Sequence, residues 1–215
     1  MPTTVTWDYI DESSFKADDP EKALAVAEEF LAAARDPETF YDDDVTPAAL
    51  FIAASESFYD ALLPLRAYEA AREAQDAPGD AAPDKRVYLI EGLLRTGQEA
   101  EANELAKALR AEKPEDPMVY SFLGDSYDAA GDAHNAERWF DMGIEMVTKV
   151  INDADDLDRD ELADAMETRE LLILGRHAVR HAAGHQPDDL DEEALEILEE
   201  YDETDEDDDD DDDEK

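Results

Sequence analysis

The sequence contains no cysteine. A protein without thiols has no disulfide framework, no cysteine nucleophile and no zinc site of the cysteine type. Long apolar runs are missing too, because the longest clean one, residues 48–54, is far shorter than the roughly 20 residues that cross a membrane as a helix. The first residues also lack the basic and apolar segments of a signal peptide. We therefore expect a soluble, cytoplasmic protein.

Basic residues are scarce: 18 lysines and arginines stand against 62 aspartates and glutamates, which gives a net charge of −44. Residues 202–215 carry 12 of the acids and one lysine, and a run of like charges with nothing to bury is expected to be disordered. Removing this tail still leaves a net charge of −33, so the whole chain is acidic. Such a surface disfavours nucleic acids and anionic membranes as partners. It suits a salt-loaded cytoplasm, as in haloarchaea, or an acidic actinobacterial proteome.

Glycine is also rare, and two of the eight glycines mark an internal repeat. A shift of 34 residues places segment 83–109 on segment 117–143, so that Pro83 falls on Pro117 and Gly97 on Gly131. The second copy has an aromatic residue, Leu-Gly, Tyr, Ala, Phe and Gly in succession, at Tyr120, Leu123, Gly124, Tyr127, Ala136, Phe140 and Gly143. This pattern resembles the tetratricopeptide repeat (TPR).

A weaker copy precedes these two by 35 residues. It has Leu62-Leu63-Pro64 where the family has a glycine turn between the two helices. The resemblance covers residues 47–150, as three repeats at about 47–81, 82–115 and 116–150. It implies an all-α solenoid of TPR-like helical hairpins that bury their apolar faces by stacking.

The remaining segments are expected to flank the repeats. Residues 1–17 read as a docked arm in which a short strand remains an option, and residues 18–46 as a helical segment. Capping signals such as Asp19-Pro20 and Thr46-Pro47 start helices. Residues 151–201 are expected to form C-terminal helices ahead of the tail 202–215. The expected helices outside the two clearer repeats cover residues 22–34, 48–62, 159–183 and 192–201, and no convincing strand is expected.

The resemblance also implies a function, because TPR proteins hold segments of other proteins in a groove lined by the first helix of each repeat. Three acids, Glu56, Glu91 and Asp125, occupy one equivalent position 35 and 34 residues apart. We therefore expect a non-enzymatic adaptor whose groove binds a basic or polar segment of a partner protein. Relatives that clamp a terminal carboxylate have Lys, Arg and Asn at such positions, so an acidic C-terminus is disfavoured. The groove residues are expected to be Ile52, Glu56, Tyr59, Val87, Glu91, Leu94, Ser121, Asp125 and Asp128.

Two other functions remain open at this level. An acidic chaperone or decoy would mask a basic partner through its tail and surface. A helical metal protein or enzyme would use His177, His181 and His185, which are spaced by four. The first two fall on the expected helix 159–183, and Gly184 is expected to end that helix before His185. Since no carboxylate partner is evident from the sequence, the histidines are interpreted as polar surface residues, and neither a cofactor nor a metal is expected.

Two further motifs are interpreted as structural. Five acids, Asp156, Asp158, Asp160, Asp164 and Glu167, have the spacing of a calcium loop, but the required turn glycine is missing and the segment is a good helix start. Gly124, Asp125 and Ser126 resemble a hydrolase motif of the Gly-Asp-Ser type. Because they fall inside a repeat helix without a nearby base, no catalytic residue is expected.

Overall fold

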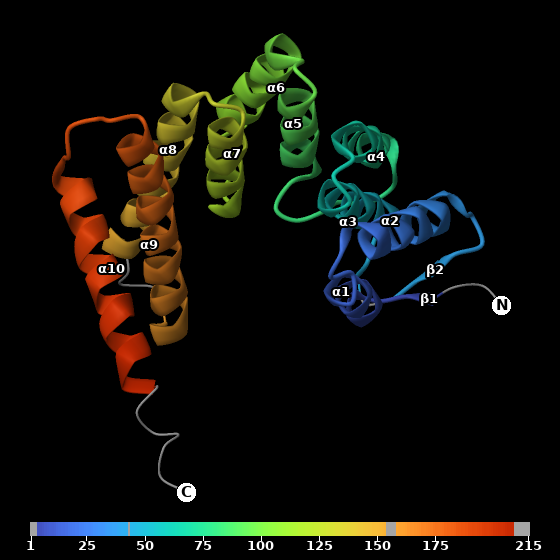
Figure 1. Ribbon diagram of the computed structural model, residues 1–215, viewed down its shortest axis with the longest axis horizontal. Coiled ribbons are helices and arrows are strands. Elements are labelled where there is room, and N and C mark those ends of the chain that lie inside the picture. Colours follow the sequence, from blue (N-terminus) through green and yellow to red (C-terminus); the bar gives the residue numbers. More distant parts are fainter. Residues whose placement is uncertain (1–3, 43, 154–157, 209–215) are drawn as a thin grey trace, which may run out of the picture. The chain divides into compact units, whose positions relative to one another are not determined.

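The computed structural model of the chain describes residues 4–42, 44–153 and 158–208, and the side chains among them up to Tyr201 (Figure 1). Within these residues the fold is all-α, as the sequence predicts, apart from two strands of two residues each. The chain divides into two compact units, residues 1–119 and 120–215, which are described separately. The helices are α1 (Trp7–Phe15), α2 (Pro20–Arg35), α3 (Pro47–Asp60), α4 (Pro64–Asp76), α5 (Lys85–Arg95), α6 (Glu99–Glu112), α7 (Met118–Ala129), α8 (Ala133–Asn152), α9 (Arg159–Ala182) and α10 (Asp189–Asp208).

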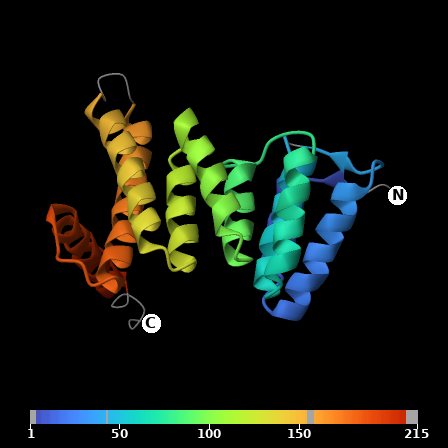
Figure 2. The ribbon, with the colours of Figure 1, turned by 90° about the horizontal axis from the view of Figure 1, so that it is seen from above.

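In the first unit, successive helices pack against one another from α2 to α6 (Figure 2). The N-terminal arm is tied down by strand β1 (Thr4–Val5), which pairs in parallel with β2 (Phe40–Tyr41). The short strand that the sequence leaves open in residues 1–17 is thus present as β1, whereas β2 lies in residues 18–46, where only a helical segment is expected. Val5 is fully buried, so the N-terminal arm is held by this short strand pair and by the burial of an apolar side chain.

Three helical hairpins end their first helix in the same way. In α3–α4, α5–α6 and α7–α8 a residue with positive φ stands in the turn: Leu62 at 60°, Gly97 at 76° and Gly131 at 78°. The following amide donates to a carbonyl five residues back, over 2.9 Å, 2.8 Å and 2.9 Å respectively. Such six-to-one bonds satisfy carbonyls that a helix end leaves without partners. The turn geometry thus recurs with the 35- and 34-residue spacing of the sequence repeat.

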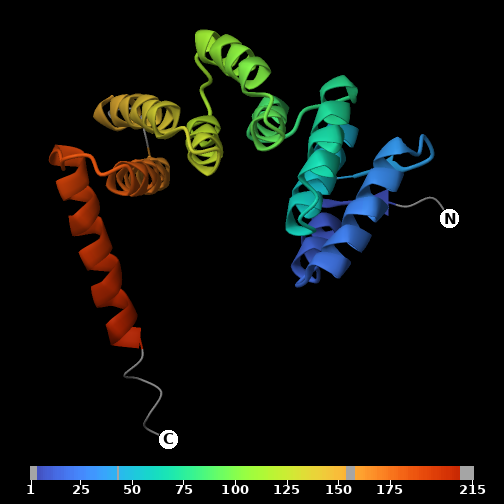
Figure 3. The ribbon, with the colours of Figure 1, turned by 45° about the horizontal axis from the view of Figure 1, so that its top comes forward.

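In the second unit, α9 packs against both α8 and α10 (Figure 3). The Phe140 ring of α8 lies between Gly124 of α7 and Gly175 of α9, and a Cβ atom at either glycine would come within 2.5 Å of the ring. Tyr120 and Trp139 also pack together, with their ring centroids 5.8 Å apart. These three aromatic residues are buried and belong to the core of the unit.

The last two helices differ from expectation mainly at the C-terminus. Asp158 and Glu161 form the expected capping box, and α9 stops before Gly184, whose φ is 71°. Helix α10, however, continues to Asp208, beyond the expected end at Tyr201 and into the segment that the sequence predicts to be disordered. Extending an existing helix costs much less than starting one, which lets α10 continue into acidic residues. Residues 209–215 lie outside the described part.

A helix long and apolar enough to cross a lipid bilayer is not found among the described residues.

Candidate functional site

The nine expected groove residues are not equally accessible. In the first unit Ile52, Val87 and Leu94 are buried, and in the second unit Ser121 is buried as well. Tyr59 and Glu91 are half-buried, while the residues that remain exposed are Glu56, Asp125 and Asp128. The exposed members of the set are thus all acidic, and its aliphatic members belong to the interior.

Glu56 of α3 and Glu91 of α5 are brought together in the first unit. The two helices pack on each other, and the charge of Glu91 acts on Glu56. Burial first, and then the charges of Glu91 and Asp60, raise the pKa of Glu56 to about 7. Glu56 is nevertheless exposed by surface area. A carboxyl group that is still reached by solvent loses part of its hydration to the protein atoms around it, and this loss raises its pKa.

Glu56 and Glu91 differ in their cationic neighbours. Arg95 donates from Nε to Glu91 Oε1 over 2.8 Å, and its guanidinium lies 4.8 Å from the centre of the Tyr59 ring. None of the described residues forms an ion pair with Glu56, whereas Glu91 has one. The Tyr59 hydroxyl is buried without a hydrogen-bond partner among the described residues. We call Glu56, Tyr59, Glu91 and Arg95 the Glu56–Glu91 surface.

Tyr88 also lies near this surface. Its hydroxyl donates to the carbonyl oxygen of Ala82 over 2.9 Å. Burial, followed by the charges of Glu56 and Glu91, raises the pKa of Tyr88 well above its ordinary value. The effect of both carboxylates on one phenol shows that their charges converge on the same part of the first unit.

Asp125, the third acid of the expected row, belongs to the second unit. Burial first, and then the charge of Asp128, raises the pKa of Asp125. It shares with Glu56 the combination of an exposed position, partial desolvation and an acidic neighbour. Asp125 lies on α7 in the second unit, whereas Glu56 and Glu91 belong to the first.

Sequence reasoning missed an ion-pair network at one end of the second unit. Arg176 of α9 is buried, and its Nη1 and Nη2 donate to both carboxylate oxygens of Asp188 over 3.0 Å and 2.7 Å. Its Nε donates to Asp141 of α8 over 2.6 Å. Arg180 pairs with Glu137 of α8 and donates from Nε to Asp191 of α10 over 3.0 Å. The two arginines therefore join three helices through charge-assisted hydrogen bonds.

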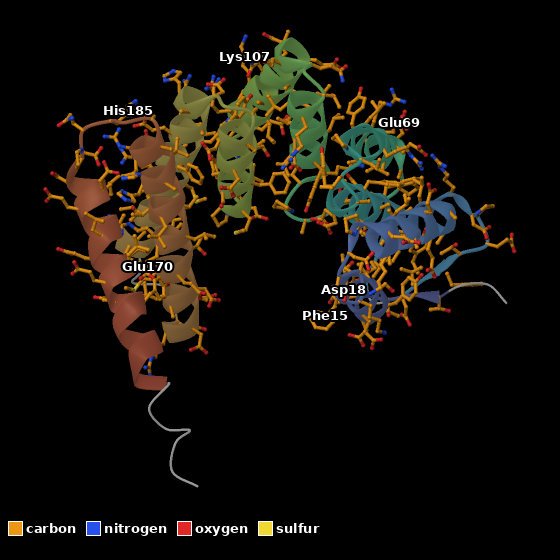
Figure 4. The ribbon with its side chains drawn as sticks, in the orientation of Figure 1. Phe15, Asp18, Glu69, Lys107, Glu170 and His185 are labelled. Carbon is orange, nitrogen blue, oxygen red and sulfur yellow. The ribbon has the colours of Figure 1, made fainter. Side chains whose placement is uncertain are left out.

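The histidines lie at the edge of this network. His177 Nδ1 is 3.1 Å from Asp191 Oδ1, and His185 Nδ1 is 3.4 Å from Glu137 Oε2. His185 follows the end of α9, where the chain turns towards α10 (Figure 4). The three histidines are thus not one row on a single helix. The carboxylate partners of His177 and His185 come from α10 and α8, so no local sequence pattern could have revealed them.

The segment whose acids have the spacing of a calcium loop forms the start of α9 in the structure. Asp158 accepts hydrogen bonds from the amides of Asp160 and Glu161, which makes it the N-cap of α9. Asp156 lies outside the described residues. The described residues contain no group of three or more side chains that could hold a metal ion.

The Gly-Asp-Ser segment is part of the α7 packing. Gly124 lies against the Phe140 ring, and Ser126 is buried, with its hydroxyl donating to the carbonyl oxygen of Phe122 over 2.8 Å. The Ser126 proton is donated to its own helix backbone and not to a side-chain base, as an activated nucleophile requires.

Comparison of the chain with protein-family models, with curated proteins and with solved structures gave no match.

Proposed function

We propose that the protein is a non-enzymatic, TPR-like adaptor that binds a basic or polar segment of another protein through the Glu56–Glu91 surface. The hairpin turns after α3, α5 and α7 repeat one geometry at spacings of 35 and 34 residues, which supports the repeat assignment. The equivalent acids Glu56, Glu91 and Asp125 then stand on the first helix of each hairpin.

The observation that carries the proposal is the unbalanced charge of Glu56. Its carboxyl group is partly desolvated beside Glu91, and no cationic side chain among the described residues pairs with it. Desolvation and like charge both disfavour the ionised form. A lysine or arginine from a partner would remove this repulsion and form a charge-assisted hydrogen bond.

Ile52, Val87 and Leu94 are buried, so they are not available to contact a partner. These side chains stabilise the fold and leave little aliphatic area for a ligand. The Tyr59 ring is covered on one face by Arg95. Binding at this surface therefore depends on charge and hydrogen bonding more than on apolar area, and it is expected to weaken as salt increases.

The experiment is a fluorescence-anisotropy titration of the full chain with a labelled lysine-rich peptide. The variant Glu56→Gln/Glu91→Gln is expected to weaken binding about tenfold, equivalent to about 1.4 kcal/mol. Adding Asp125→Asn tests whether the second unit contributes. The matched control is Glu99→Gln/Glu104→Gln, which removes two exposed charges from α6 of the same unit.

The same titration separates the proposal from an acidic decoy. A decoy binds through total charge, so the α6 control and removal of residues 202–215 would weaken binding as much as the site variant does. An adaptor of the proposed kind loses affinity with the site variant and retains it with the other two. Equal losses in all three proteins would contradict the proposal.

A further inference from the structure

His177 and His181 lie on the same face of α9, four residues apart. Their ring centroids are 6.0 Å apart and the ring planes are inclined by 38°. Two imidazoles that share a tetrahedral ion, with metal–nitrogen bonds of about 2.0–2.1 Å, have centroids roughly 5–6 Å apart. The pair is therefore close to the separation that one bridging ion requires.

Asp191 orients the first of these rings. Its Oδ1 lies 3.1 Å from His177 Nδ1, and since a carboxylate only accepts, Nδ1 carries the proton. The lone pair of the neutral ring then belongs to Nε2, on the far side of the ring from Asp191. Ligating histidines in metal sites are commonly held by a carboxylate in this manner, which fixes the tautomer and makes the ring more basic.

Asp191 is itself fixed. It is 3% exposed, and its Oδ2 accepts hydrogen bonds from Arg180 Nε and from the backbone amide of Asp188, each over 3.0 Å. The orienting carboxylate is thus set by the ion-pair network and needs no rearrangement. His181 is exposed and its side chain forms no hydrogen bond with a described residue, so its ring can turn to meet an ion.

The surrounding charges favour a cation. Two arginines, Arg176 and Arg180, lie in the network, but they are outnumbered by its four carboxylates, Glu137, Asp141, Asp188 and Asp191. Both guanidinium groups are engaged by these acids. An ion at the histidine pair therefore meets a net negative environment.

We propose that His177 and His181 bind one divalent late transition-metal ion, of which Zn²⁺ is the representative, with Asp191 as the carboxylate that orients His177. Imidazole nitrogen suits Zn²⁺, Ni²⁺ and Cu²⁺ and does not suit Mg²⁺ or Ca²⁺. The described residues supply no third ligating side chain, so water completes the coordination and the ion exchanges readily. Because the site lies in the second unit, it is independent of the proposed Glu56–Glu91 surface.

The test is a calorimetric titration of the full chain with Zn²⁺ in about 1 M potassium chloride and excess Mg²⁺. The salt screens the acidic surface and the Mg²⁺ occupies carboxylates, including those of the tail, so that imidazole binding remains. The parent protein is expected to bind one ion. His177→Gln and His181→Gln are each expected to abolish this binding, and His134→Gln, in α8 of the same unit, is expected to leave it unchanged.

Two further measurements keep the result independent of folding effects. Asp191→Asn is expected to weaken binding about tenfold to a hundredfold while leaving one site. The chain has only four histidines, so imidazole nitrogen NMR resolves each of them. With Zn²⁺ the signals of His177 and His181 are expected to shift, and those of His134 and His185 to stay. Binding that survives His181→Gln, or equal shifts of all four rings, would overturn the proposal.

Discussion

Leu62 occupies in the hairpin α3–α4 the position that Gly97 occupies in α5–α6. Both residues have a positive φ, 60° and 76°, and the residue after each donates to a carbonyl five positions back. Glycine adopts this conformation readily, whereas leucine adopts it at a cost in free energy because its Cβ comes close to the backbone. The first turn therefore keeps the geometry of the repeat with an unfavourable residue.

Leu62→Gly is expected to stabilise the first unit. The side chain is 75% exposed, so little packing is lost, and relief of the left-handed strain outweighs the extra flexibility of glycine by a few tenths of a kcal/mol to about 1 kcal/mol. Thermal unfolding followed by circular dichroism measures the change. The matched control is Leu65→Gly, an exposed leucine in the first turn of α4, which is expected to destabilise because glycine favours the helix less than leucine does. A lower melting temperature for Leu62→Gly would contradict this view of the turn.

Gly124→Ala is expected to destabilise the second unit, although alanine is the better helix former. The new Cβ would lie 2.5 Å from Phe140 Cζ, and overpacking of this kind typically costs about 1–3 kcal/mol. Phe140→Leu creates space, so the double variant is expected to lose less stability than the sum of the two single changes. Phe140→Ala alone is expected to cost about 3–5 kcal/mol. Additive losses in the chemical-denaturation curves would show that the two residues do not meet.

Glu56→Gln is expected to stabilise the protein at alkaline pH and to have little effect near pH 4. The folded-state pKa of Glu56 is raised from 4.5 to about 7, so the folded chain holds a proton that the unfolded chain has released between these values. Stability from this group therefore falls as pH rises from 4.5 to 7, and above 7 its full cost is present. Melting temperatures of the variant and the parent are to be compared at several pH values. A difference that does not change with pH would contradict the raised pKa.

Salt is expected to stabilise the whole chain. The net charge of −44 opposes compaction, and at about 1 M potassium chloride the screening length falls to roughly 3 Å. The melting temperature is expected to rise from dilute buffer to molar salt. The ion pairs around Arg176 are screened as well, but its guanidinium is buried and the pairs are few, so the global repulsion dominates. A flat or falling curve would contradict adaptation to salt.

The helical architecture was readable from the sequence because its signals are local. Glycine turns, proline at helix starts and the capping box of Asp158 and Glu161 each act within a few residues. The sequence leaves open a short strand in residues 1–17 but does not indicate its pairing with β2, because two-residue strands carry no alternating pattern and their partners are about 36 residues apart. Helix α10 is longer than expected, because extending an existing helix costs little even where its like charges repel one another.

The site was less accessible to sequence reasoning. Periodicity placed Glu56 and Glu91 at equivalent positions, and the packing of α3 on α5 brings them together. The repeat period does not show which neighbouring side chains are buried. Ile52, Val87 and Leu94, which were expected to line the groove, are buried in the structure. The pairing of His177 with Asp191 depends on the turn that returns α10 along α9, and no pattern within either helix encodes it.

The most direct test of the adaptor proposal is the pH dependence of lysine-peptide affinity for the parent and for Glu56→Gln. A cation binds the ionised form of Glu56, whose pKa in the free protein is about 7, and lysine stays charged throughout this range. The parent affinity is therefore expected to rise as pH increases towards 7 and to level off above it. The variant is expected to bind more weakly and without this rise, because the titrating group is gone. A pH-independent affinity in the parent, or the same rise in Glu56→Gln, would contradict recognition of a basic segment at Glu56.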